Sequence, residues 1–80
     1  MSEKDILDRV GELVAEERAL RERAVGRGLQ EAEEERLGDV EVRLDQCWDL
    51  LRQRRARTEF GRDPDEAVLR PGPEVEGYES

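Results

Sequence analysis

The residues best able to do chemistry are four arginines that lie close together. Arg52, Arg54, Arg55 and Arg57 fall within six positions. A guanidinium group can bind phosphate bidentately, so this arginine block is a candidate partner-binding site for a nucleic acid or for ribosomal RNA. Against this, the formal net charge of −8 repels a polyanion, and no aromatic residue is interleaved with the arginines. Pairing of the block with acids of the same chain or of a second copy is the favoured interpretation, and nucleic-acid binding stays the alternative.

Ordinary catalytic groups are scarce. The chain has no histidine, Lys4 is its single lysine and Cys47 is its single cysteine. Without an imidazole there is no usual general base near neutral pH and nothing to activate the thiol. We therefore expect a protein that is not an enzyme, with no catalytic residue and no cofactor.

Two further patterns have structural explanations. Glu31, Glu33, Glu34 and Glu35 could attract a divalent cation, but acids are also favoured at a helix N-terminus, and the run lacks the glycine-bearing spacing of a calcium loop. The segment 26–28 (GRG) has no strand before it and no P-loop lysine after it, so it indicates a turn. We expect no metal site.

The elements that must position these residues are helices. Ser2 is a suitable N-cap for a helix over residues 3–25, and the glycines of segment 26–28 are suited to a reversal. A second helix is expected over residues 30–59. Along the first helix Ile6, Val10, Leu13, Leu20 and Ala24 fit steps of three and four residues, with Glu17 as the one polar position in the series. Along the second helix the apolar residues in such steps are Leu37, Val40, Leu44, Cys47 and Leu51. The pattern predicts an all-α fold, an antiparallel, coiled-coil-like two-helix hairpin over residues 1–60.

A hairpin of this size needs additional burial to be stable. Eighty residues give a marginal core, and a single cysteine cannot close an internal disulfide. We expect a homodimer in which two hairpins form a four-helix bundle, with an unidentified protein as the other candidate partner. The expected interface residues are those that widen the apolar stripes: Leu7, Val14, Trp48, Leu50 and Leu51. Trp48 is expected to be largely buried, either there or beneath Val75 or Tyr78 of the C-terminal segment.

The composition changes after the second helix. Segment 63–66 (DPDE) has the features of a helix start, and Pro71 and Pro73 end it, so a short helix and an extended tail are expected over residues 61–80. Two alternatives stay open, a tail that docks on the helices and a flexible one. The hairpin geometry also brings the arginine block beside the acids at the start of the first helix, Glu3, Asp5 and Asp8, and the acidic C-terminal segment can also reach the block.

The chain has no apolar run near the ~20 residues that span a bilayer, and residues 1–5 are charged with no hydrophobic signal region behind them. A cytoplasmic protein with no membrane association is expected. The sequence as a whole predicts a non-enzymatic module for protein interaction or oligomerisation.

Several stretches together resemble a known family. They are the run 44–56 (LDQCWDLLRQRRA), Gly61 with segment 63–66, segment 13–17 (LVAEE) and segment 75–78 (VEGY). In these stretches the chain resembles a short actinobacterial family, domain of unknown function 2630, over essentially its whole length. The resemblance implies a small helical protein of the bacterial cytoplasm and assigns no activity to any residue.

Overall fold

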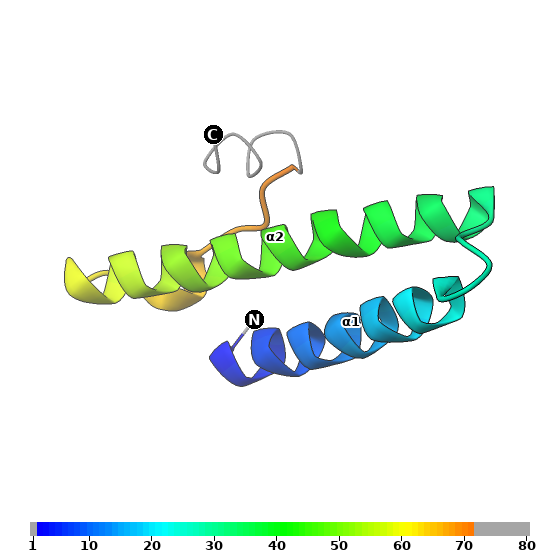
Figure 1. Cartoon of the computed structure of the whole chain (residues 1–80). Helices are drawn as coiled ribbons and strands as arrows, with labels where there is room; N and C mark the ends of the chain where they lie inside the picture. Colours follow the sequence, from blue (N-terminus) through cyan, green and yellow to red (C-terminus); the bar gives the residue numbers. More distant parts are fainter. Residues whose placement is uncertain (1, 72–80) are drawn as a thin grey trace.

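The computed structural model describes residues 2–71. Helix α1 (Glu3–Ala24) and helix α2 (Glu31–Glu59) are followed by a single 3₁₀ turn, η1 (Pro64–Glu66). Figure 1 shows α1 and α2 side by side and antiparallel, with α2 extending well past the start of α1. The all-α two-helix hairpin expected from the sequence is confirmed, and residues 2–71 contain no strand.

Local side-chain chemistry explains why α1 begins where it does. The Ser2 hydroxyl accepts a hydrogen bond from the Asp5 amide, and the Asp5 carboxylate accepts one from the Ser2 amide, each at 3.2 Å. This reciprocal capping box satisfies two amides that have no partner inside the helix. The bonds from Ser2 also lower the pKa of Asp5, since they favour its charged form.

Glycines end both helices. Gly26 and Gly28 have φ values of 84° and 74°, a left-handed conformation that costs a residue with a Cβ but not glycine. At the end of α2, Gly61 has a φ of 71°, and the amides of Gly61 and Arg62 donate to the carbonyls of Thr58 and Arg57. This Schellman motif turns the chain back toward α2.

The hydrophobic core lies between the two helices. It consists of buried residues from α1 (Ile6, Val10, Leu13) and α2 (Val40, Leu44, Cys47, Leu50), with Val14, Leu51 and Ala67 packed against it. Leu50 is only 4% exposed, so its expected place on the outer interface is wrong. The reason is that residues after η1 return along α2 and cover that side, which widens the core beyond the predicted seam.

The returning segment, residues 63–71, is called the strap below. Asp63 caps η1 by accepting a hydrogen bond from the Asp65 amide at 2.9 Å, as the Asp-Pro pattern indicates. Figure 1 shows the strap running back along α2 from the far end of that helix. Of the two alternatives for residues 61–80, docking on the helices therefore holds as far as residue 71; Pro73, Val75 and Tyr78 lie outside the described residues.

Within residues 2–71, neither helix has a stretch long and apolar enough to cross a membrane.

Candidate functional site

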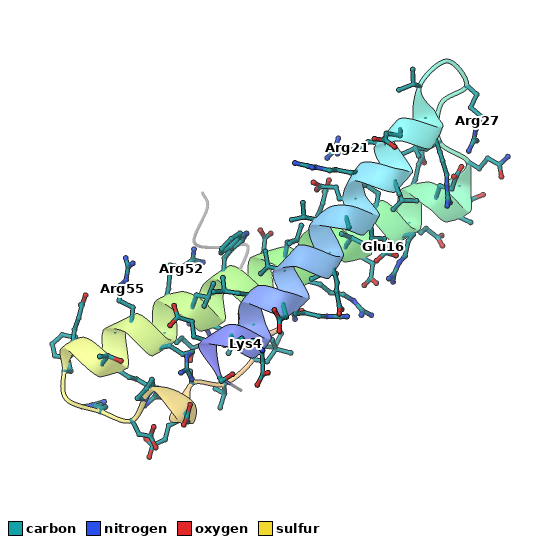
Figure 2. All side chains as sticks on the ribbon, turned by 90° about the horizontal axis from the view of Figure 1, so that it is seen from below. Lys4, Glu16, Arg21, Arg27, Arg52 and Arg55 are labelled. Atoms are coloured by element: carbon teal, nitrogen blue, oxygen red, sulfur yellow. The ribbon has the colours of Figure 1, made fainter. Side chains whose placement is uncertain are left out.

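The hairpin has two faces that differ in what covers them. One face, the strap face, carries the strap on α2. The opposite face, the open face, is formed by the sides of α1 and α2 that point away from the strap. Figure 2 shows Arg21, Arg52 and Arg55 on one side of the hairpin, and Glu16 together with η1 on the other. The candidate site residues divide between these two faces.

Hydrogen bonds from α2 hold the strap along its length. The Gln53 side-chain amide donates to the Val68 carbonyl at 2.7 Å and accepts from the Val68 amide at 3.2 Å. Two turns earlier on α2, the Gln46 side-chain amide donates to the Arg70 carbonyl at 3.1 Å. The two glutamine side chains thus bind backbone groups of the strap, and these hydrogen bonds fix the position of the strap along α2.

Asp49 anchors the strap through its charge. Its side chain is 1% exposed, and both its oxygens accept from the Arg70 guanidinium, with Nε donating to Oδ2 at 2.8 Å and Nη2 to Oδ1. Gln53 donates to Oδ2 at 2.8 Å. The Arg70 bonds are the main reason that the pKa of Asp49 lies below its usual range, although burial works in the opposite direction.

The arginine block is split between intrachain pairing and the open face. Arg54 contacts Asp65 at 2.8 Å and Arg57 contacts Glu66 at 3.5 Å, so two of the four arginines bind acids of η1. Both acids belong to the C-terminal segment, one of the two acidic neighbours that the sequence suggested for the block. Glu3, from the other suggested group, lines a groove together with Arg52 and Arg55. Arg52 and Arg55 are exposed and form no ion pair with any residue in 2–71.

A groove follows α2 beyond the start of α1. Its volume is ≈650 Å³, and its walls include Trp48, Leu51, Arg52, Arg55 and, from α1, Glu3. The groove exists because α2 overhangs α1, so the seam of α2 has no helix to pack on there. Pro64 of η1 lines one edge of this groove.

The open face exposes large apolar side chains near its middle. Leu7 is 48% exposed and Trp48 is 43% exposed. Val14 and Leu51 are half-buried at the edge of the core. Burial of Trp48 at an interface with a second copy stays a prediction, and its alternative cover, Val75 or Tyr78, lies outside the described residues.

Two ion pairs between the helices fix their register, one at each edge of the seam. Arg36 binds Glu16 through two nitrogens on the strap side, and Arg21 binds Glu41 at 3.1 Å on the open side. The bonds from Arg36 are the main cause of the lowered pKa of Glu16. Glu3, in the first turn of α1, lines the same groove as Trp48 and Leu51, so the N-terminal part of α1, which carries Leu7, lies beside the part of α2 that carries Trp48.

Other predicted features are structural. Cys47 is 6% exposed, and burial raises the pKa of its thiol, so the side chain acts as a core residue. In the acidic run at the start of α2, Glu33 accepts from the Gln30 amide and pairs with Arg27. Across the part of the chain described, no three acidic or thiol side chains come together as metal ligands would.

Sequence reasoning missed the buried pair Asp49 and Arg70. An aspartate inside a highly charged helix normally faces water, and its partner is 21 positions away, beyond a turn and a proline. The one available signal was the spacing of Gln46, Asp49 and Gln53, which places three polar side chains on one side of α2.

Comparison with known proteins agrees with the resemblance seen in the sequence. The family described as "Protein of unknown function (DUF2630)" matches residues 2–80. The uncharacterized proteins Mb0922c of Mycobacterium bovis and Rv0898c of Mycobacterium tuberculosis are each 51% identical over 78 residues, which is 96% of this chain and 90% of theirs. No solved structure matches the chain. The two-helix chain with its docked strap is therefore a member of the DUF2630 family.

Proposed function

We propose that this protein is a non-enzymatic helical module of the bacterial cytoplasm that pairs with a second copy through its open face, forming a four-helix bundle. The observation that carries the proposal is the exposure of Leu7 and Trp48 on neighbouring parts of the two helices. The strap covers the opposite face, so one face is finished by the chain itself while the other keeps a tryptophan in water.

The energetics favour pairing. A two-helix core of this size offsets chain entropy only narrowly, and each buried Å² of apolar surface contributes about 25 cal/mol. Tryptophan is enriched among the residues that dominate interface energies, because it buries a large area at a small entropic cost. Covering Trp48 and Leu7 on two copies at once adds burial that a single chain lacks.

Sedimentation equilibrium tests the proposal with a matched pair of variants. Leu7→Gln removes an apolar side chain from the open face, whereas Leu69→Gln makes the same change on the strap, where Leu69 is 60% exposed. We expect a wild-type dimer at micromolar concentration, a dissociation constant raised at least about tenfold by Leu7→Gln, and little change with Leu69→Gln. A wild-type chain that remains monomeric to high micromolar concentration would rule the proposal out.

The alternative function, a nucleic-acid or ribosome-associated factor, has less support. Arg54 and Arg57 contact Asp65 and Glu66, which leaves Arg52 and Arg55 to meet phosphate. RNA binding measured over a salt series would separate the two functions, because two phosphate contacts predict a shallow salt slope that Arg52→Gln and Arg55→Gln abolish. Equal RNA retention by wild type and this double variant would remove the alternative.

A further inference from the structure

The open face of α2 carries a charge pattern that is complementary to itself. Glu41, Trp48 and Arg55 are spaced seven residues apart and so lie on one stripe of the helix. At 1.5 Å per residue, Glu41 lies about 10 Å before the tryptophan and Arg55 about 10 Å after it. An acid and a base therefore stand at equal distances on either side of the largest exposed side chain.

From this arrangement we infer that the two copies pack face to face with their α2 helices antiparallel, Trp48 on the two-fold axis, and Arg55 of each copy against Glu41 of the other. The inference rests on the proposed dimer and specifies its geometry. The two-fold axis then lies in the plane between the two open faces and runs perpendicular to the helices. It places α2 of one copy on α2 of the other, with the opposite direction. Each ion pair is then made twice.

Three further observations agree with this axis. Leu7 lies in the part of α1 beside the part of α2 that carries Trp48, so the axis that brings Trp48 to its copy also brings Leu7 near its copy. Asp45 lies three residues before Trp48 and Arg52 lies four residues after it, so Asp45 of each copy faces Arg52 of the other as a second complementary pair. Glu41 is 50% exposed and uses Oε1 for Arg21 at 3.1 Å, so Oε2 can accept a second guanidinium.

The other face-to-face arrangement, with parallel α2 helices, lacks this complementarity. There α2 of one copy would stack on α1 of the other at the same level. Arg55 would then face the start of that α1 helix, and Glu41 of one copy would not meet Arg55 of the other. Antiparallel stacking is therefore the arrangement that uses the complementary pattern of Glu41 and Arg55.

Exchange of charges provides the test. Arg55→Glu and Glu41→Arg each place like charges at both symmetric contacts, so we expect either variant alone to raise the dimer dissociation constant roughly ten- to a hundredfold. In an equimolar mixture both contacts become attractive again. A heterodimer with close to wild-type affinity should therefore form, seen by native mass spectrometry.

Two controls keep the outcomes distinct. Arg62→Glu makes the same charge change outside α2 and should leave the dimer unaffected. The second pair of variants, Asp45→Arg and Arg52→Glu, leaves the Arg21–Glu41 contact intact. This pair replaces the first one in the test if circular dichroism shows that Glu41→Arg lowers the helix content. A stable wild-type dimer that tolerates each single exchange, with no heterodimer preference, would overturn the antiparallel geometry. A monomeric wild type would instead overturn the dimer itself.

Discussion

Asp49 and Arg70 form a two-point ion pair that ties the strap to the middle of α2, with Nε to Oδ2 at 2.8 Å. The carboxylate is 1% exposed and the guanidinium is 24% exposed, so the pair is largely shielded from water. Gln53 donates to the same carboxylate. This contact holds the strap over one face of the hairpin, whereas the open face keeps Leu7 and Trp48 exposed.

Removing the guanidinium should destabilise the chain. With Arg70→Gln, a buried carboxylate keeps only the Gln53 bond, and we expect the free energy of unfolding to fall by about 1–3 kcal/mol. Urea denaturation at a fixed protein concentration measures this. Arg55→Gln, compared at a concentration where the chain is monomeric, should change the value by less than about 0.5 kcal/mol. An equal loss in both variants would mean that the strap contact contributes nothing specific.

The same pair predicts a dependence on pH. The folded pKa of Asp49 lies below the reference value of 3.8, so the unfolded chain binds the proton more readily. The stabilisation is present above that value and is lost as the pH falls through the lower folded pKa. Urea unfolding of wild type and Arg70→Gln should therefore differ most near pH 7 and converge below 3.8. A difference that stays constant into strong acid would contradict this linkage.

The position of Leu50 gives a packing prediction. Leu50 is 4% exposed inside the core, whereas the neighbouring Leu51 is half-buried. Leu50→Ala should cost about 2–4 kcal/mol in the free energy of unfolding, because it leaves a cavity between the helices and the strap. Leu51→Ala should cost clearly less. Thermal unfolding followed by circular dichroism compares the two, and the reverse order would place Leu51 in the core instead.

Cys47 should be protected while the chain is folded. The thiol is 6% exposed, and its pKa is raised by burial, so little thiolate is available to react. Alkylation at neutral pH should be slow in buffer and rapid in denaturing urea. Fast modification of the native protein would show that the core around the thiol opens easily.

Much of the fold follows from local patterns. Ser2 and the paired glycines Gly26 and Gly28 stand where capping and turn chemistry require them, and the apolar spacing identifies the two helices. Leu50 was misplaced because its cover comes from the strap. No local pattern shows that the strap, which follows the end of α2, will return and pack on that helix.

The candidate site was predictable in part. Leu7, Val14 and Trp48 follow from the width of the apolar stripe, since that depends on position around a helix. The division of the arginine block does not. Arg54 and Arg57 contact η1 while Arg52 and Arg55 do not, and this depends on where the strap crosses α2, which is set by long-range contacts such as that of Asp49 with Arg70.

The central claim, that the open face pairs with a second copy, is tested most directly by the chain's single tryptophan. Acrylamide quenching of Trp48 can be measured across a dilution series, with the molar mass followed by light scattering. Pairing predicts that quenching rises on dilution as the mass falls from dimer to monomer. Quenching that does not change with concentration, in a chain that has monomer mass throughout, would contradict the account.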